Sequence, residues 1–548
     1  MRGHCLATLI LTASGVLSAG PAPASALESA ATGRTLTVLT ARTEINYDPA
    51  VLTQAAVSLH GLVLRRLTTW DVRPGEPTRV VPDLATDTGR SSDGGRTWTY
   101  TLKAGLKYED GTPITSADIK YGVERSFAPE HTGGLGYHKA LLTGGADYRG
   151  PYAGSRLASI ETPDPRRIVF RLRMAYQEWP WIASMPAFVP VPQARDDDPA
   201  TYGDRPVASG PYMYRAYQPG IRLELLRNPH WDRATDQVRT AEPDRIVMEL
   251  GVSAQDQAQR MIADRGADRD AIAQSGIPPE YMAQVRGDPA VRGRVLNGGP
   301  DRLNYLAVNT RRGALKLLKV RQAIQYAVDK QAFRETLRGT LGAVRVATTL
   351  LPPGTAGRVD YNLYATDPSG DVPKARKLLA DAGHPDLKLT LRTVDDEATL
   401  ERAGTIQRGL ARAGITVTLK PVTAAALAAS LSKDTDYDLC LYSWLADFPS
   451  PAGNLQPLFA SSETGGGHNM SQYANPAVDA AMDRALAEPD RRKAEAQWAR
   501  LDERLMRDAA AVPLINTGLS VLNGSNIRNF VVSSTPQFPD MQRISLAA

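Results

Sequence analysis

The second half of the chain alternates between helical and strand patterns. Helix-like segments at 372–383 and 400–414 are followed by strand-like segments at 387–394 and 415–422. A further strand pattern, "YDLCLYSW", covers 437–444. Helices that alternate with strands form α/β layers, in which the helices cover the faces of the sheet. The sequence therefore predicts an α/β lobe in this half.

The first half of the chain has a different character. Segments at 34–40, 96–102, 166–172 and 221–228 have the patterns of strands, with turn sequences such as "SDGG" and "EDGT" nearby. The 548 residues exceed the roughly 250–300 residues that one core usually reaches. We therefore expect two or three lobes of unlike architecture. A cleft between lobes is a common place for a ligand.

Two helices are predicted outside the alternating series. The segment 116–127 has helical spacing, with Ser116 as a candidate N-cap residue. The segment 320–337 has one continuous amphipathic pattern and is predicted to be a single long helix. Two more helices are expected within 474–507.

The N-terminus has the layout of a secretory signal. Arg2 precedes an apolar stretch from Cys5 to about Leu17, and the small residues of segment 24–26 follow. A transmembrane anchor is the alternative, but this stretch is shorter than the roughly 20 residues that span a bilayer. We expect cleavage near Ala26. The mature protein would be secreted, periplasmic or held at the outer face of the cytoplasmic membrane.

Composition and motifs exclude several classes of protein. The net charge of +5 comes from mixed charges without a basic stripe, which argues against nucleic-acid binding. Removal of the signal would leave Cys440 as the sole cysteine, so no intrachain disulfide is expected. The seven histidines have no metal-ligand spacing, and the motifs HExxH, GxSxG and the P-loop are absent. We therefore expect no metal, no cofactor and no catalysis.

One acidic residue stands at the end of a strand pattern. Asp447, in "SWLADFPSP", follows an apolar run and has aromatic neighbours in Trp444 and Phe448. Ligands of open α/β sheets bind outside the carboxyl ends of strands. A carboxylate among aromatic rings is costly to bury unless it is paired, and no basic residue lies close in sequence. Asp447 either caps the turn before Pro449 or awaits a positive charge from a ligand.

Five ordered segments carry a family resemblance. "VVPDLATDTGRSSDGGRTWTYTLKAGLKYEDGTPITSADIKYGVERS" (80–126) is similar to a stretch found in the solute-binding proteins of peptide-type ABC importers, family 5. The other segments are "ASGPYMY" (208–214), "VRQAIQYAVDK" (320–330), "HNMSQYANPAVDAAM" (468–482) and "AAVPL" (510–514). The chain therefore resembles the peptide, dipeptide, oligopeptide and nickel type of extracellular binding protein.

The resemblance implies a fold and a division into domains. It implies an α/β fold of the two-lobed periplasmic-binding-protein type (type II, cluster C), with an extra strand-rich domain and a ligand cleft between lobes. The implied division is as follows: signal peptide 1–26, lobe I at 34–59, 187–270 and 516–548, domain II at 60–186, and lobe III at 271–515.

The resemblance also implies ligand-binding residues. Asp447 matches the acid that grips the α-amino group of bound peptides in relatives. Ser443, Trp444 and Leu445 match the strand whose backbone pairs with an extended peptide. The other matches are cleft positions: Tyr121, Gln274, Ser275 and Asn469.

Two expected arginines are missing. Peptide-binding members hold the ligand's carboxylate with an arginine at the position of Leu441 or near Thr393. Here the second place carries "VDDEA", whose acids would favour a cationic group. The resemblance therefore leaves open whether the ligand is a peptide or another cationic solute.

The resemblance implies a binding protein without catalysis that delivers its solute to the permease subunits of an ABC importer. A small molecule or peptide is the expected ligand, a monomer is the expected state, and nucleic acid is not an expected partner. Two alternatives remain at this point. One is a sensory receptor for peptide signals with the same fold, and the other is a secreted hydrolase, which would turn its ligand over.

Overall fold

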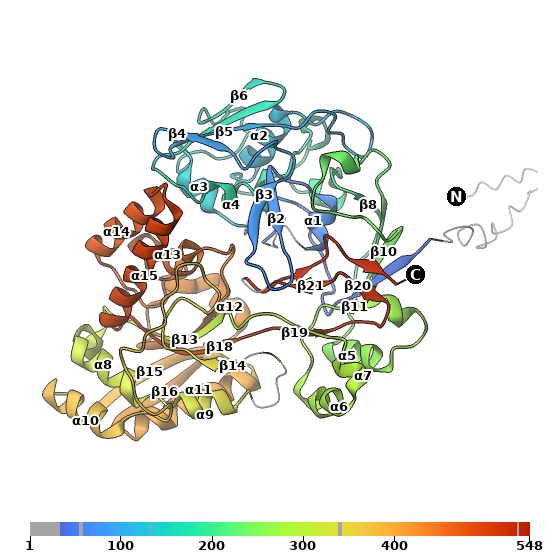
Figure 1. Ribbon diagram of the computed structural model, residues 1–548. Helices are drawn as coiled ribbons and strands as arrows, with labels where there is room; N and C mark the ends of the chain where they lie inside the picture. The colour runs from blue at the N-terminus through green and yellow to red at the C-terminus, as the bar shows by residue number, and fades with distance from the viewer. Residues whose placement is uncertain are drawn as a thin grey trace, which may run out of the picture.

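The computed structural model describes residues 33–53, 58–131, 133–337, 342, 344–533 and 536–547. The predicted signal segment and its cleavage position lie outside the described residues. Figure 1 shows a strand-rich part at the top and an α/β part at the lower left. Strands from near both ends of the chain meet at the right, where a blue strand from near the N-terminus and the red β20 lie close to the C-terminus. The lobes of unlike architecture expected from the sequence are present.

Lobe I is built on a five-stranded sheet with the order β11-β1-β10-β9-β8. β1 runs parallel to β10 and β11, and β9 is antiparallel to β8 and β10. Two of these strands, β1 and β9, lie within the strand patterns predicted at 34–40 and 221–228. The strands are β1 (Thr35–Leu39), β8 (Tyr212–Gln218), β9 (Arg222–Arg227), β10 (Arg245–Glu249) and β11 (Ala271–Ala273).

Small paired strands complete lobe I on its C-terminal side. β12 pairs with β19, which lies far along the chain, whereas β20 pairs with β23 and β21 pairs with β22 within the C-terminal segment. The helix α1 (Leu59–Val63) is wholly buried beneath them and the main sheet. The strands are β12 (Val295–Asn297), β19 (Ser520–Leu522), β20 (Ile527–Arg528), β21 (Val531–Val532), β22 (Pro539–Asp540) and β23 (Ser545–Leu546).

Domain II contains an antiparallel four-stranded sheet with the order β4-β5-β7-β6. The hairpin of β2 and β3 lies beside it, and three helices cover it. The strands are β2 (Thr68–Asp71), β3 (Arg79–Pro82), β4 (Arg90–Ser92), β5 (Thr97–Thr101), β6 (Ile160–Asp164) and β7 (Arg167–Arg171). The helices are α2 (Ser116–Arg125), α3 (Tyr137–Leu141) and α4 (Trp179–Ile182).

The N-cap residue of α2 differs from the prediction. Thr115, not Ser116, is the N-cap residue, and Asp118 completes a capping box with it. The Ser116 hydroxyl instead donates to the carbonyl of Asp164 at the end of β6. The prediction was wrong by one residue because both positions carry a hydroxyl.

Lobe III has a six-stranded mixed sheet with the order β14-β18-β13-β17-β15-β16. β15 is parallel to β16 and β17, whereas β13 is antiparallel to β17 and β18. The strands are β13 (Arg302–Val308), β14 (Val344–Val346), β15 (Leu387–Val394), β16 (Ile415–Val422), β17 (Leu439–Trp444) and β18 (Ala511–Thr517). The helices packed on this sheet include α10 (Val372–Asp381), α11 (Glu397–Ala411) and α12 (Ala424–Ser430). The predicted α/β lobe is confirmed.

The single helix predicted at 320–337 is two helices, α8 (Leu318–Ala327) and α9 (Lys330–Glu335). Val328 is extended, and the Asp329 carboxylate accepts a hydrogen bond from the Ala332 amide as the cap of α9. Both helices bury apolar side chains in the same core, so the hydrophobic pattern continues across the break. Periodicity alone therefore did not show the break.

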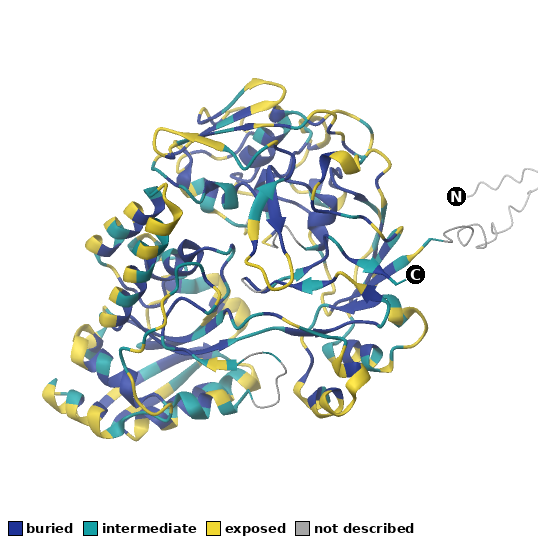
Figure 2. Cartoon of the chain, viewed as in Figure 1, coloured by how far each residue is buried: buried dark blue, intermediate teal, exposed yellow. Residues whose placement is uncertain are grey.

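Three helices form the outer corner of lobe III nearest domain II: α13 (Pro451–Phe459), α14 (Pro476–Ala487) and α15 (Arg491–Arg507). The last two are the helices predicted within 474–507. α13 begins with Pro451 at its first turn and follows directly after Asp447 and Phe448. Figure 2 shows that the outer helices of lobe III are exposed on their outward faces, while the sheet behind them is more buried.

The segment 271–297, predicted in lobe III, packs on lobe I. It contains β11 of the lobe I sheet, α6 (Met282–Gly287) and α7 (Pro289–Arg292). Its apolar side chains share a core cluster with Leu39 of β1 and with α5 (Ala254–Ala263). We therefore propose that lobe III begins close to residue 300, and the other predicted boundaries stay predictions.

One hydrophobic cluster extends from domain II into lobe III. It includes Phe170 and Trp179 on one side and Phe448, Leu455 and Trp498 on the other. The two parts therefore contact one another directly in this structure. Within the described ranges, no helix combines the length and the apolar character that crossing a membrane requires.

Candidate ligand-binding site

The strand β17 places Asp447 at the junction of domain II and lobe III. β17 is a central strand of the lobe III sheet, and it pairs with β13 from Leu439 to Trp444. Asp447 follows shortly after the strand ends, at the carboxyl edge where ligands of α/β sheets bind. Ser450 then caps α13 by accepting a hydrogen bond from the Ala452 amide. Strand and helix therefore hold Asp447 from both sides.

Domain II provides the immediate neighbours of Asp447. The Tyr137 hydroxyl, at the start of α3, donates a 2.8 Å hydrogen bond to the Asp447 carboxylate. The Phe448 ring makes an edge contact with Tyr137 at 5.5 Å between ring centroids and stacks on Trp181 at 6.5 Å. Asp447 thus lies among aromatic rings that belong to two different parts of the molecule.

No internal cation neutralises Asp447. Among the described residues, no lysine or arginine forms an ion pair with its carboxylate, and the Tyr137 hydroxyl is its hydrogen-bond donor. Burial raises the pKa of Asp447 to about 6, although the hydrogen bond from Tyr137 favours the charged form. Within the described ranges, no backbone amide of the turn before Pro449 donates to this carboxylate, and its donor is Tyr137. The charge of Asp447 therefore lacks a cationic partner within the described parts of the chain.

Further contacts join domain II to lobe III beside this site. The Ser450 hydroxyl donates a 2.9 Å hydrogen bond to Glu178, and the Gln177 amide donates to the carbonyl of Leu486. Burial raises the pKa of Glu178. A cavity of about 360 Å³ lies next to these contacts and is lined from both sides, by Trp181 of domain II and Trp498 of lobe III among others.

The edge of β17 that faces β15 is partly free. The two strands pair only through Leu391 with Leu439 and through Arg392 with Cys440. From Leu441 onwards this side of β17 has no strand partner among the described residues. An extended ligand backbone can add to such an edge through main-chain hydrogen bonds.

A cavity of about 530 Å³ lies beside this free edge. We call it the arginine chamber. Its lining residues include Leu441, Tyr442 and Ser443 of β17 and two arginines, Arg302 and Arg402. The remaining lining residues come mostly from neighbouring strands and helices: Asn304, Phe333, Leu337, Val344, Val394, Thr399, Leu427, Thr517 and Gly518.

The sequence predicted three strand residues at this site, and the structure gives them different surroundings. Ser443 is exposed and lines the arginine chamber. Leu445 is half-buried between the strand and Asp447. Trp444 is buried, its indole nitrogen donates to the carbonyl of Gly453, and its ring lies 4.8 Å from that of His468. The Trp444 side chain therefore supports the strand from inside lobe III.

Two predicted cleft residues are buried within the fold instead. Tyr121 is 5% exposed, and its hydroxyl donates to Asp196 in a network with Arg125. Asn469 is fully buried and holds its own loop through hydrogen bonds to the carbonyls of Ala460 and Tyr473. Internal partners satisfy both side chains in this structure, and the role of these two residues in binding stays a prediction.

Gln274 and Ser275 lie directly after β11 in lobe I. Both are half-buried, and their backbone amides donate to the Leu39 carbonyl and to the Gln257 side chain. Within the described parts of the chain, neither residue forms a hydrogen bond with Asp447 or with β17. Their role in binding stays a prediction.

Sequence reasoning missed Tyr137, Arg302 and Arg402. Tyr137 follows the glycine-rich segment "TGGLG", which signals a loop and gives no sign of a binding role. Arg302 starts β13 and Arg402 lies in α11, and only the sheet brings them to one cavity. Alternation along β13 could have placed Arg302 and Asn304 on one face, but not next to Arg402.

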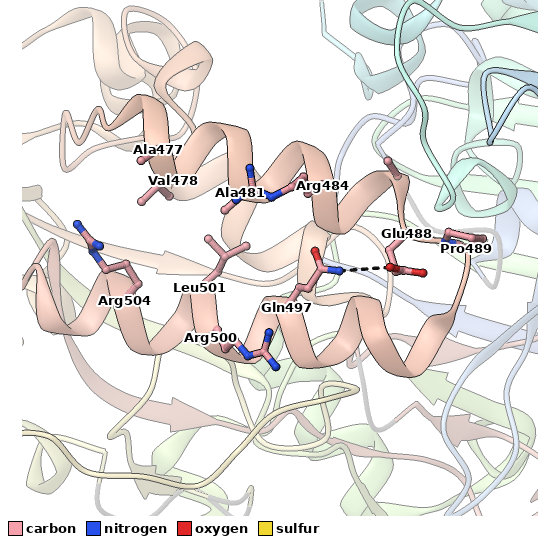
Figure 3. A pocket seen from close by; sticks show the side chains of 11 residues that line it. Ala477, Val478, Ala481, Arg484, Glu488, Pro489, Gln497, Arg500, Leu501 and Arg504 are labelled. Carbon is pink, nitrogen blue, oxygen red and sulfur yellow. Dashed lines mark hydrogen bonds between the residues drawn. The ribbon is translucent and has the colours of Figure 1, made fainter.

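Other cavities do not combine these features. The cavity in Figure 3, about 620 Å³, is formed entirely by α14, α15 and their connection, with Arg484, Arg500 and Arg504 around Leu501. A larger hollow in lobe I, about 1010 Å³, is lined by Asp48 and His131 among others. Within the described ranges, no group of histidine, cysteine and acidic residues could hold a metal ion.

Comparison with known proteins identifies the family. The model of the bacterial extracellular solute-binding proteins, family 5, matches residues 79–466. This chain belongs to that family. The match covers domain II, much of lobe I and the part of lobe III that contains β17 and Asp447.

Relatives in this family are binding proteins. The chain is 26% identical over 463 residues to the Probable D,D-dipeptide-binding periplasmic protein DdpA of Escherichia coli (strain K12), covering 83% of this chain and 82% of DdpA. It is 24% identical to the glutathione-binding protein GsiB of Salmonella paratyphi A, covering 80% and 81%. A solved structure, the clavulanic acid biosynthesis oligopeptide binding protein 2, superposes with a TM-score of 0.88 at 32% identity, covering 94% and 96%.

Family 5 membership and this superposition confirm the expected two-lobed α/β fold and the solute-binding role. Other solved family structures agree on the fold, including a murein tripeptide-binding protein, MppA, in an unliganded open form, with a TM-score of 0.72 at 21% identity. The named relatives are binding proteins rather than enzymes.

Tyr137→Phe tests the contact between domain II and Asp447. Removal of the hydroxyl leaves the family 5 fold and the ring contact with Phe448 intact, but the Asp447 carboxylate loses its donor. A hydrogen bond to a charged group contributes about 1.5–3 kcal/mol. We expect affinity for an amine-bearing ligand to fall roughly 10- to 100-fold by calorimetry. Tyr148→Phe is the control, because the Tyr148 hydroxyl bonds only to a loop carbonyl.

Proposed function

We propose that this chain captures a small peptide or a related amine-bearing solute outside the cytoplasm and delivers it to the permease of an ABC importer. The observation that carries this proposal is the Asp447 carboxylate, which lies at the junction of domain II and lobe III without a cationic partner. A carboxylate in such a place favours a ligand with a positive charge, because the ligand then neutralises it. No step of this process requires catalysis.

The neighbouring groups support a peptide-like ligand. The amino end of the ligand pairs with Asp447, and its backbone adds to the free edge of β17 near Ser443. Every peptide offers the same backbone N–H and C=O groups, so this mode of binding tolerates different side chains. Phe448, Tyr137 and Trp181 exclude water around the charge pair and so strengthen it.

Contacts between domain II and lobe III couple binding to closure. The hydrogen bonds of Tyr137 with Asp447 and of Ser450 with Glu178 form only when the two parts meet. A ligand that bridges them favours the closed form over the open one. To reverse a 1:99 ratio of closed to open form, the ligand must bind the closed form more tightly than the open form by about 5.5 kcal/mol. A micromolar ligand supplies about 8.2 kcal/mol in total, which is enough to drive such a change.

The remaining parts of the proposal concern location and assembly. We propose that the segment before Ala26 is a signal peptide that is removed on export, and that the mature protein is periplasmic or held at the outer face of the membrane. The closed form docks as a monomer on the permease subunits. Nucleic acid has no part in this role.

Native mass spectrometry of the protein purified from its own envelope tests the proposal. We expect a co-purified solute whose mass and fragmentation show a free amine, released when the protein is unfolded. Calorimetry with pooled dipeptides, tripeptides and tetrapeptides gives the affinity, and mass spectrometry of the same samples shows whether any peptide is cleaved. Turnover of the peptides, or an absence of binding by amine-bearing solutes, would contradict the proposal.

The affinity should depend on pH through Asp447. Its pKa of about 6 in the free protein means that lower pH neutralises the carboxylate before the ligand can pair with it. Below pH 6 we expect affinity for an amine-bearing ligand to fall by up to about tenfold per pH unit. The measurement is calorimetry between pH 8 and pH 4.5. Asp447→Asn should lose this dependence, and a flat profile for the unmodified protein would argue against Asp447 as the charge partner.

A further inference from the structure

The two arginines that line the arginine chamber have no ion-pair partner among the described residues. Arg302 forms no ion pair among the described residues, and Arg402 donates only to the Thr399 hydroxyl, at 2.7 Å. Both side chains are half-buried, and burial lowers the pKa of each guanidinium. Arginine nevertheless keeps its proton in proteins. Two desolvated charges of the same sign in one cavity are costly unless something neutralises them.

The acids closest to these arginines neutralise them only in part. Asp301 precedes Arg302, but burial raises the pKa of Asp301 to about 8, so this carboxyl is mostly protonated near neutral pH. Asp396 and Glu401 favour the charged form of Arg402, but neither forms an ion pair with it among the described residues, and the Asp396 carboxylate accepts from the Thr399 amide as the N-cap of α11. Within the described part of the chain, none of the residues that line the chamber is acidic.

The position of the chamber relates it to Asp447. Leu441, Tyr442 and Ser443 of β17 form one wall of the chamber, and Asp447 follows on the same segment. A ligand that lies along the free edge of β17 with its amine at Asp447 therefore directs its other end into the chamber. The volume of about 530 Å³ lies within the usual range for ligand pockets.

We propose that the arginine chamber binds a doubly anionic end of the ligand, so that the preferred solutes carry an ammonium at one end and two carboxylates at the other. A peptide with a free C-terminus and a final aspartate or glutamate has this chemistry. One carboxylate would neutralise only one of the two guanidinium groups, whereas two carboxylates pair with both. This inference rests on the proposed function, because it takes the amine end of the ligand to be at Asp447.

Matched peptides test the inference. Calorimetry compares Ala-Ala-Ala with Ala-Ala-Glu, with corresponding dipeptide and tetrapeptide pairs in parallel. A hydrogen-bonded charge pair contributes about 1.5–3 kcal/mol, so we expect the peptide ending in glutamate to bind roughly 10- to 100-fold more tightly. Equal affinities within every pair would overturn the inference.

Variants of the two chamber arginines test whether the preference for Ala-Ala-Glu arises in the chamber. Arg302→Gln and Arg402→Gln should each reduce the advantage of Ala-Ala-Glu to roughly threefold or less, with thermal melts to confirm folding. Arg408→Gln is the matched control, because Arg408 lies on the same helix as Arg402 but is exposed. Retention of the full preference in both chamber variants would show that the second carboxylate binds elsewhere.

The same experiment separates this inference from the proposed function. Suppose that the neutral peptides bind, that Asp447→Asn abolishes this binding, and that the acidic peptides bind no more tightly. The proposed function then stands, and only the inference of a dicarboxylate preference is contradicted. If no peptide of any length binds, the proposed function fails and the inference fails with it. A preference for Ala-Ala-Glu that disappears in the Arg302 and Arg402 variants supports both.

Discussion

Asp447→Asn should abolish high-affinity binding of an amine-bearing ligand and leave the fold intact. The substitution keeps the shape of the side chain and its contact with Tyr137, but removes the charge that pairs with the ligand's ammonium. Loss of one partner of a buried charge pair costs about 2–5 kcal/mol. The dissociation constant should therefore rise by roughly 30-fold to several thousand-fold, as measured by calorimetry.

The stability of this variant should move in the opposite direction. The pKa of Asp447 rises from its ordinary value to about 6 on folding, so the free protein carries an unfavourable charge at neutral pH. Above pH 6 the buried charge destabilises the native state. As pH falls from about 6 toward 4, the native carboxylate takes up its proton before the unfolded one does, so this destabilisation is lost. Asn removes the cost, so we expect the Tm at pH 7.5 to be unchanged or higher.

Asp386→Asn is the matched control for both measurements. Asp386 is an exposed acid just before β15, outside the contacts of Asp447. We expect its affinity and Tm to equal those of the unmodified protein. Unchanged ligand affinity in Asp447→Asn, with a normal melting curve, would remove Asp447 from the binding site. A large loss of Tm in that variant would instead show that the carboxylate is structural.

Most of the fold could be predicted because local patterns agree with the packing. β15 and β16 have the predicted bounds, since their apolar residues alternate and glycine ends the preceding helices. The break between α8 and α9 could not be predicted, because the hydrophobic pattern continues through Val328. The cap residue Asp329 therefore follows a sequence that gives no sign that the first helix has ended. The packing of segment 271–297 against Leu39, on which our proposed lobe III boundary rests, could not be predicted because it is a long-range contact.

The candidate site was predictable only in part. Asp447 could be found because an acid at the carboxyl end of an apolar strand, without a basic residue nearby, is locally unexplained. Tyr121 was chosen from the resemblance, yet its hydroxyl is used by Asp196, and Tyr137 occupies the junction instead. The arginines missing at Leu441 and Thr393 suggested a site without positive charge. Arg302 and Arg402 supply that charge from positions that no local pattern connects.

Asp83→Asn should destabilise the whole protein strongly while leaving the ligand site untouched. Asp83 of domain II lies in a fully buried network with Arg65 and with Arg239 of lobe I. Its carboxylate accepts from Arg65 at 2.7 Å and from Arg239 at 2.9 Å, and Asp236 pairs with Arg239 at 3.0 Å. Asn would leave two buried guanidinium groups with Asp236 as their remaining acid. Breaking a buried ion pair in this way costs about 3–5 kcal/mol.

Denaturant unfolding of Asp83→Asn at pH 7.5 measures this loss. Burial alone would raise the pKa of Asp83, but Arg239 and Arg65 outweigh it and hold the pKa below its ordinary range. The contribution of Asp83 is therefore present at neutral pH and is lost as pH falls through that lowered pKa. Asp87→Asn is the control, since its surface pair with Arg90 contributes at most about 1 kcal/mol. A loss for Asp83→Asn no larger than for this control would mean that the buried arginines do not depend on Asp83 to join domain II to lobe I.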